Sequence, residues 1–230
     1  MSGLDEESCR YEVKFVAEHV ANDRLSRWVQ SHWAGFSPAH PPRRVSNIYF
    51  DNANLEDFGL NVAGISRRSK TRLRWYGDGI DSVRPQLEFK FRRDRVGWKT
   101  TYPITELGLQ DATWKGIIQH VSSQIPVEAR ARFLSAMLPV LINRYSREYF
   151  TPKDGGIRLT IDRNQSVFDE RLTRGPQFRY RVNLPEFSIL ELKFGIAHVR
   201  DAKEILKSIP LRPSRSSKYV TGLKAILRGI

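Results

Sequence analysis

A chain of 230 residues is long enough to bury a sizeable hydrophobic core, and a content of 40% hydrophobic and 11% aromatic residues argues against disorder. The 38 Lys and Arg residues exceed the 25 Asp and Glu residues, which gives a formal net charge of +13. This charge predicts a polyanionic partner, such as nucleic acid, an anionic membrane surface or a phosphate-rich small molecule. Charge alone does not choose among the three.

The sequence contains no run that approaches the roughly 20 apolar residues of a membrane-spanning helix. The opening residues, MSGLDEESCR, lack the basic and apolar regions of a secretory signal, so we expect a cytoplasmic protein. Cys9 is the single cysteine and the five histidines are scattered, which excludes an internal disulfide and offers no Cys/His zinc spacing. A metal here would therefore be held by carboxylates, the ligands that suit Mg²⁺ and Mn²⁺.

Apolar periodicity predicts an α+β fold. Helices are expected from about residue 22, and near 109–122, 127–138, 199–208 and 216–228. The segments GFSPAHPPRR and RLTRGPQFRYRVNLPE are expected to be loops because of their Pro, Gly and Ser content. Long strand stretches with inserted helices, without a strict βαβ rhythm, predict one domain over residues 1–230 with a mainly antiparallel sheet. Alternation predicts about eight strands, at residues 9–16, 43–51, 69–76, 86–92, 98–104, 140–150, 156–163 and 186–194.

Three of the predicted strands repeat the motif Glu-x-Lys. Residues i and i+2 lie on the same face of a strand, so each motif places both charges opposite its apolar neighbours. Two further strands show the same division, one with Lys70, Arg72 and Arg74 on its charged face, the other with Arg158, Thr160 and Asp162. The Glu-x-Lys pairs are Glu12 and Lys14, Glu88 and Lys90, and Glu191 and Lys193.

Two interpretations fit five strands that share an apolar and a charged face. In the first, the charged face is solvated and its ions form weak exposed pairs, as in many one-sided antiparallel sheets. In the second, the apolar face packs against helices while the charged face curls inward to line a barrel. Cations that converge in this way repel one another by up to about 4 kcal/mol per close pair at intermediate dielectric, so such a barrel needs an anion. Phosphate groups fit, because Arg offers a bidentate fork and a Glu among the cations can hold a divalent metal.

The motifs RYEVKF, IYFD, RLRWYG, LEFK, RYSREYF, ILELKFG and SSKYVTG follow one another in this order across nearly the whole chain. In this order they resemble the VTC domain, the polyphosphate-polymerase branch of the triphosphate tunnel metalloenzymes. The resemblance implies an antiparallel eight-stranded β-barrel tunnel with helices packed outside. It also implies an ATP:polyphosphate phosphotransferase that moves the terminal phosphate of ATP onto inorganic polyphosphate with a divalent metal, usually Mn²⁺, or Mg²⁺.

The resemblance also implies roles for individual residues. Lys218 would lie beside the transferred phosphoryl group, and Arg215 occupies a position that is often Lys in the family. Glu191 would be the metal ligand, whereas Glu12 and Glu88 are either further metal ligands or partners that orient a neighbouring Lys. The implied catalytic residues are Lys218, Arg72, Arg74 and Lys193, and the implied phosphate or nucleotide ligands are Lys14, Lys90, Arg147, Arg158 and Arg215.

Each residue also has a simpler explanation. Lys218 falls on an amphipathic helical pattern where an exposed Lys is ordinary, and Tyr49 and Asp51 of IYFD fit strand-end packing and a turn. Residue types alone do not separate a polymerase from a tunnel triphosphatase that hydrolyses triphosphate or nucleotide. A third alternative is a non-catalytic module that binds polyphosphate or nucleic acid. Nucleic acid is disfavoured because most strand aromatics fall opposite the charges, while a membrane-bound partner and the oligomeric state stay open.

Overall fold

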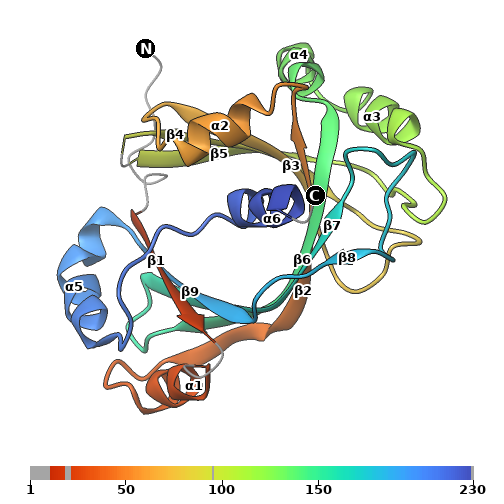
Figure 1. Ribbon diagram of the computed structural model, residues 1–230. Coiled ribbons are helices and arrows are strands. Elements are labelled where there is room, and N and C mark those ends of the chain that lie inside the picture. The colour runs from red at the N-terminus through yellow and green to blue at the C-terminus, as the bar shows by residue number, and fades with distance from the viewer. Residues whose placement is uncertain (1–10, 19–21, 95, 229–230) are drawn as a thin grey trace.

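The computed structural model describes residues 11–18, 22–94 and 96–228 of the chain (Figure 1). Cys9 and the first two positions of the strand expected at 9–16 lie outside the described residues. Eight antiparallel strands follow one another across a single sheet in the order β1-β9-β7-β6-β2-β3-β4-β5, and the short β8 (Arg181–Val182) pairs with β7 beside this path. The eight are β1 (Tyr11–Glu18), β2 (Ser37–Asp51), β3 (Arg68–Tyr76), β4 (Gln86–Arg93), β5 (Val96–Pro103), β6 (Leu138–Thr151), β7 (Ile157–Asp169) and β9 (Phe187–Phe194).

The sheet curls into a half-barrel, so that one face is convex and the other concave (Figure 1). Six α-helices accompany it in the described part of the chain, which confirms the predicted α+β class and the eight-stranded antiparallel sheet of the tunnel fold, present as a half-barrel. They are α1 (Asn22–Ser31), α2 (Glu56–Val62), α3 (Trp114–Ser122), α4 (Val127–Ser135), α5 (Val199–Ser208) and α6 (Lys218–Arg228), with a 3₁₀ turn at Ile196–His198.

Two hydrophobic clusters cover the convex face. Residues of β2, β3 and β4 such as Leu73 and Phe89 pack with Ile117 of α3 and Phe133 of α4. Residues of β1, β7 and β9 pack with α1 and α5, for example Leu192 against the cluster that contains Leu25 and Ile205. These strand residues are the apolar members of the alternating patterns, so burial of the apolar face dictates which way the sheet curls.

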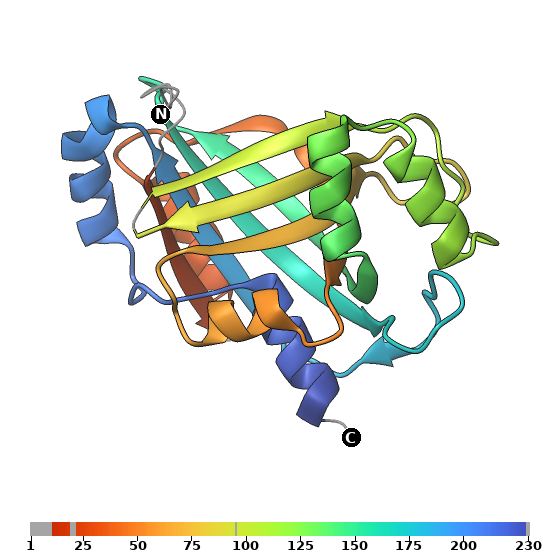
Figure 2. The same ribbon diagram turned by 90° about the horizontal axis from the view of Figure 1, so that it is seen from above.

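Helix α6 differs from the expectation that the helices pack outside. Its Tyr219 and Leu223 pack on Tyr49, Leu141 and Val167, which belong to the concave side of the sheet. In Figure 1 α6 lies within the curve of the sheet, and Figure 2 shows it beside α2 at one end. The amphipathic pattern predicts that α6 buries one face, but it does not say against which side of the sheet.

The segment GFSPAHPPRR was wrongly expected to be a loop, because β2 begins at Ser37. From Ser37 to Arg44 the strand pairs only with β6, and pairing with β3 starts at Val45. Proline cannot donate to a sheet ladder, and it is tolerated where one side of a strand has no partner. The register shifts in this stretch, between Pro38 and His40 and between His40 and Arg43, agree with that explanation.

Three smaller differences between the predicted and the observed elements concern two helices and a short strand. Helix α2 was not predicted from its sequence. It is anchored by Asp51, whose carboxylate accepts hydrogen bonds from the backbone amides of Asp57 and Phe58. The helix expected at 109–122 begins only at Trp114, where the side chain of Thr113 caps its first turn. The segment RLTRGPQFRYRVNLPE is a loop except for β8.

Candidate functional site

The concave face gathers the charged side chains that the alternation predicted. Arg72, Arg74, Glu88, Asp162 and Glu191 are each at most 7% exposed, so the interpretation of a solvated charged face is wrong. Lysines and arginines outnumber carboxylates among the described residues gathered there. The cations are Lys14, Lys70, Arg72, Arg74, Lys90, Lys99, Arg147, Lys193 and Lys218, and the carboxylates are Glu12, Glu88, Asp162 and Glu191.

Arg72 and Glu88 form a buried pair between neighbouring strands. Arg72 Nε donates to Glu88 Oε2 at 2.7 Å, a second guanidinium nitrogen donates to the same oxygen, and Lys99 Nζ lies 3.0 Å from Glu88 Oε1. Burial disfavours the Glu88 carboxylate, but Arg72, Arg74 and Lys99 outweigh it and hold the Glu88 pKa far below its usual range. Neither Arg72 nor Lys99 is shared with a second carboxylate of the described residues, so the geometry favours the orienting role of Glu88 over metal binding.

Arg74 has neutral partners. Its Nε donates to Asn47 Oδ1 at 2.8 Å, and its Nη2 lies 3.3 Å from the hydroxyl of Tyr145. Arg72 Nη1 similarly lies 3.3 Å from the hydroxyl of Tyr49. These contacts fix both guanidinium planes, and they leave the charge of Arg74 without a carboxylate in ion-pair contact among the described residues.

Glu12, Lys14, Glu191 and Lys193 form a square of alternating charge on β1 and β9. Lys14 Nζ lies 2.6 Å from Glu12 Oε1 and 3.3 Å from Glu191 Oε2, while Lys193 Nζ lies 2.5 Å from Glu191 Oε1 and 3.5 Å from Glu12 Oε2. The register explains this arrangement, because Glu12 pairs with Lys193 and Lys14 with Glu191. Burial opposes the charge of Lys14, but Glu191 and Glu12 raise its pKa well above the usual value.

This square is the only described place where two predicted metal ligands meet. The two carboxylates share both lysines, so a divalent cation could replace the lysines between them. The described residues contain no cluster of three or more His, Cys, Asp or Glu with metal-ligand geometry. Mg²⁺ and Mn²⁺ are commonly held by one or two carboxylates together with substrate phosphates, so the Glu12 and Glu191 pair fits such an ion.

Lys70 and Lys90 carry the least compensated charges of the site. Burial, together with Lys14, Arg68 and Arg72, lowers the pKa of Lys70 to about 7, while Glu12 opposes this shift. The charge of Arg72 and then burial lower the pKa of Lys90 well below its usual value. Lys70 Nζ is 2.8 Å from the hydroxyl of Ser217, which precedes α6. An anion between these side chains would favour their charged forms.

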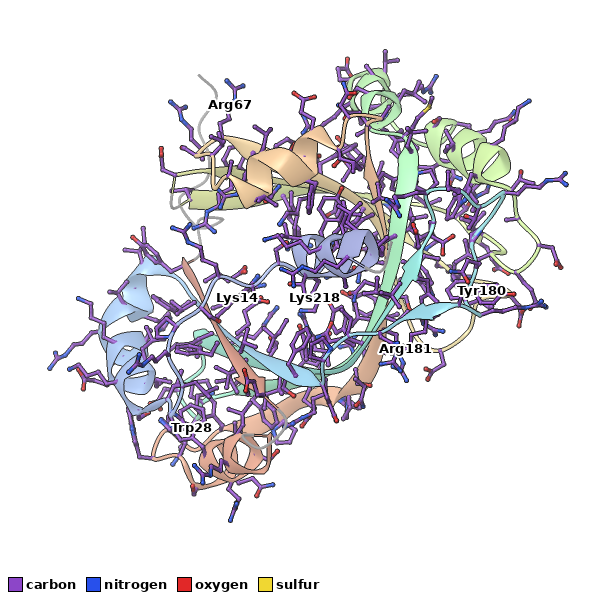
Figure 3. The ribbon with its side chains drawn as sticks, viewed as in Figure 1. Lys14, Trp28, Arg67, Tyr180, Arg181 and Lys218 are labelled. Carbon is purple, nitrogen blue, oxygen red and sulfur yellow. The ribbon has the colours of Figure 1, made fainter. Side chains whose placement is uncertain are left out.

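Asp162 joins Arg147 to the start of α6. Arg147 binds it in a bidentate fashion, with Nε to Oδ1 at 2.6 Å and Nη2 to Oδ2 at 2.7 Å, and Lys218 Nζ lies 2.5 Å from Oδ2. Lys218 Nζ also lies 4.5 Å from the centroid of the Tyr145 ring. Lys14 and Lys218 lie within the curve of the sheet in Figure 3. Lys218 is therefore not an ordinary surface lysine, because its side chain is only 11% exposed.

Tyr49 and Asp51 of the IYFD motif contact the first turn of α6 and fix its position. Tyr219 donates its hydroxyl proton to Asp51 Oδ2 at 2.6 Å, and its ring stacks on Tyr49 with 5.1 Å between centroids. Lys218 precedes Tyr219, so these two contacts hold the start of α6, where Lys218 lies, over the concave face. Tyr49 and Asp51 thus serve packing and site geometry at once, which decides an alternative that the sequence left open.

Arg158 and Arg215 lie away from the centre. Arg158 is paired in register with Lys193 on β9, but it is exposed. Arg215 is also exposed and lies near Arg68, whose pKa is lowered by burial, by Arg92 and by Arg215. The structure thus brings the other predicted residues together and leaves these two at the edge.

Sequence reasoning missed Lys99, Asp162 and Tyr145 as members of the site. Lys99 pairs in register with Lys90 across the β4–β5 hairpin, so a hairpin assignment with its register would have found it. Asp162 was placed on the charged face, but nothing in the sequence indicates that it pairs with Arg147 and Lys218. Tyr145 could have been predicted as a member of the site, because it lies two residues before Arg147 and therefore on the same face of β6.

The curled antiparallel sheet with a cation-rich concave face defines an α+β protein with the triphosphate tunnel type of fold. The sequence profile of the VTC domain matches residues 9–227, and the chain therefore belongs to the VTC domain family, which confirms the resemblance in the motifs. A search among curated proteins found no match.

Solved structures share the fold at low sequence identity. The PH1819 protein from Pyrococcus horikoshii OT3 is 15% identical, with a TM-score of 0.50 and coverage of 96% of this chain and 100% of that one. A putative adenylate cyclase from Bacillus halodurans is 17% identical, with a TM-score of 0.52 and coverage of 90% and 94%. Among the described helices, none has the length and apolar character needed to cross a bilayer.

Proposed function

We propose that this protein is a metal-dependent polyphosphate polymerase, which transfers the γ-phosphate of ATP to the end of an inorganic polyphosphate chain. Membership of the VTC domain family supports a site that handles phosphate chains. The observation that carries the proposal is the excess of cations on the concave face, where Lys70, Lys90 and Arg74 have no carboxylate in ion-pair contact among the described residues. A chain of phosphates supplies the missing charge in the right form, because it presents one anion after another.

The chemistry that we propose needs alignment and charge stabilisation more than a side-chain nucleophile. A terminal oxygen of the acceptor chain, already anionic, attacks the γ-phosphorus of ATP; the bond from this phosphorus to the β,γ-bridging oxygen breaks, and ADP leaves. The transition state is loose and its charge is spread over the equatorial oxygens, so fixed cations around it lower the barrier. Lys218, Arg72, Arg74 and Lys193 are proposed to surround the transferred group. Lys14, Lys90 and Arg147 would hold the neighbouring phosphates.

The divalent metal that the family implies would be held by Glu191 and Glu12. When bound, the ion would neutralise phosphate charge and polarise the phosphoryl oxygens. Lys14 and Lys193, which pair with these carboxylates, would then be available to turn toward phosphate oxygens. Glu88 is proposed only to orient Arg72 and Lys99, because no second carboxylate of the described residues shares these cations with it.

The test is phosphorus NMR of the purified protein with ATP and Mn²⁺, followed over time. We expect signal from internal phosphates to grow as ADP appears, and we expect neither change with Lys218→Ala or Glu191→Gln. Orthophosphate without internal phosphate would instead assign a triphosphatase, which needs the same cations but uses water as the acceptor. Binding of polyphosphate without any turnover would leave a binding module.

A further inference from the structure

A guanidinium group contacts two tyrosine rings where β3 ends. Arg43 Cζ is 5.6 Å from the centroid of Tyr76 and 5.2 Å from that of Tyr149. Tyr76 is the last residue of β3 and is 46% exposed, and Arg43 is exposed as well. No carboxylate of a described residue lies within ion-pair distance of Arg43. The site described above does not use Tyr76 or Arg43.

This group continues into the phosphate-binding residues. Arg147 Cζ lies 6.0 Å from the Tyr149 ring and 5.3 Å from the Tyr145 ring, and Lys218 Nζ lies 4.5 Å from Tyr145. Tyrosines and cations therefore alternate from the exposed Tyr76 to the buried Lys218. The register agrees, because Arg43 pairs with Arg147 across β2 and β6.

The exposed members of this row have the chemistry of a platform for a planar aromatic ligand. Nucleobases stack on tyrosine rings and on arginine planes, and such stacking tolerates any base because each has a π-face. A chain of phosphates has no aromatic group to place there. Tyr149, whose ring contacts Arg43, is largely buried, so Tyr76 and Arg43 present the accessible surface.

The spacing along β3 matches a nucleotide. Tyr76, Arg74 and Arg72 occupy every second position of this strand and therefore share its concave face. The four-residue step from Arg72 to Tyr76 spans about 13 Å in an extended strand. An extended nucleoside triphosphate has a comparable length between its base and its γ-phosphate. A base at Tyr76 therefore allows the triphosphate to run past Arg74 and Arg147 to Lys218 and Arg72.

We propose that Tyr76 and Arg43, supported by Tyr149, form the nucleobase subsite of the donor nucleotide. This inference rests on the proposed function, and it adds that the nucleotide enters at the Tyr76 end of the half-barrel. Stacking selects nucleotides over inorganic triphosphate without selecting one base over another.

The experiment compares ATP with inorganic triphosphate, using calorimetric titration of the full chain at one fixed Mn²⁺ concentration. We expect Tyr76→Ala to weaken ATP binding roughly tenfold through lost base stacking, and triphosphate binding less than about twofold. Tyr76→Phe keeps the ring and should bind ATP like the unaltered protein. Arg43→Lys keeps the charge but not the stacking plane, and should weaken ATP selectively.

Tyr180→Ala is the matched control, because Tyr180 is 79% exposed and lies on a loop outside the concave face (Figure 3). Unchanged ATP affinity in Tyr76→Ala, or an equal loss of affinity for ATP and triphosphate, would overturn the nucleobase subsite. Binding of triphosphate to the unaltered protein would still support the phosphate site in that case. An unaltered protein that binds neither ligand would overturn the proposed function and the subsite together.

Discussion

Lys218, the first residue of α6, lies 2.5 Å from Asp162 of β7, measured from Nζ to Oδ2, although 56 residues separate them in the chain. Asp162 is fully buried and also binds Arg147 through both of its oxygens. A single carboxylate thus holds two of the cations that we place around the phosphates. This contact connects the C-terminal helix to the chemistry of the sheet.

Replacement of Asp162 by Asn should destabilise the free protein and enlarge its response to ligand. The change leaves two buried cations without their partner, and we expect a loss of about 3 kcal/mol in the free energy of unfolding. Inorganic triphosphate should restore part of that loss, since it supplies negative charge to Arg147 and Lys218. Thermal unfolding with and without triphosphate measures both effects. A ligand-induced rise in Tm no larger than that of the unaltered protein would contradict the assignment of Arg147 and Lys218 as phosphate-binding residues.

Lys70 should take up a proton when a phosphate chain binds. Its pKa is lowered to about 7 by burial and by Lys14, Arg68 and Arg72, against the opposing charge of Glu12. Bound phosphate raises this pKa, so affinity should be highest below pH 7 and should fall as the pH rises above it. Calorimetry at pH 8 in HEPES and in Tris gives the number of protons taken up.

The control for this proton uptake is Lys70→Met, which should reduce it by roughly one proton. Lys90 should also contribute to the proton uptake, because its pKa is lowered as well. Equal uptake in Lys70→Met and the unaltered protein would show that Lys70 stays charged in the free protein. In the absence of ligand, the depressed pKa of Lys70 has the opposite effect on folding: its contribution to stability should improve as the pH rises from about 7 toward the pKa of an unfolded lysine.

Glu191→Gln and Glu88→Gln should separate metal binding from the orientation of cations. We expect Glu191→Gln to lower metal-dependent turnover about 100-fold or more while the protein stays folded. Glu88→Gln should also slow turnover, because Arg72 and Lys99 lose their partner, but the Mn²⁺ concentration that gives half-maximal activity should not change. Activity measured across a Mn²⁺ series tests both, and an unchanged metal response in Glu191→Gln would remove Glu191 as a ligand.

Tyr219→Phe should affect both stability and catalysis. The change removes the hydrogen bond from the Tyr219 hydroxyl to the buried carboxylate of Asp51, which should cost about 2 kcal/mol of unfolding free energy. Turnover should fall as well, since Tyr219 fixes the first turn of α6, from which Lys218 reaches Asp162. Urea denaturation and a rate measurement provide the two readouts, with Tyr180→Phe as a control on an exposed tyrosine. Lower stability with an unchanged rate would show that Lys218 does not depend on this contact.

Strand alternation in the sequence was sufficient to predict the two faces of the sheet. Period-two patterns assign Glu12 and Lys14, or Arg72 and Arg74, to one side of a strand, because successive side chains point to opposite faces. The same patterns predicted the antiparallel α+β class. The ordered motifs predicted the family, since their order depends only on the sequence.

Tertiary structure alone decided which charges meet. Lys14 lies near Lys70, and Lys193 near Lys90, only because the sheet curls and brings β1 and β9 opposite β3 and β4. The pairing of Glu88 with Arg72 and Lys99, which favours an orienting role, depends on the register of three strands. Likewise, the amphipathic pattern of α6 fits either side of the sheet. Packing on Tyr49, Leu141 and Val167, together with the hydrogen bond from Tyr219 to Asp51, places α6 on the concave one. Local patterns fix the face on which a side chain lies, whereas its partner depends on how distant strands are brought together.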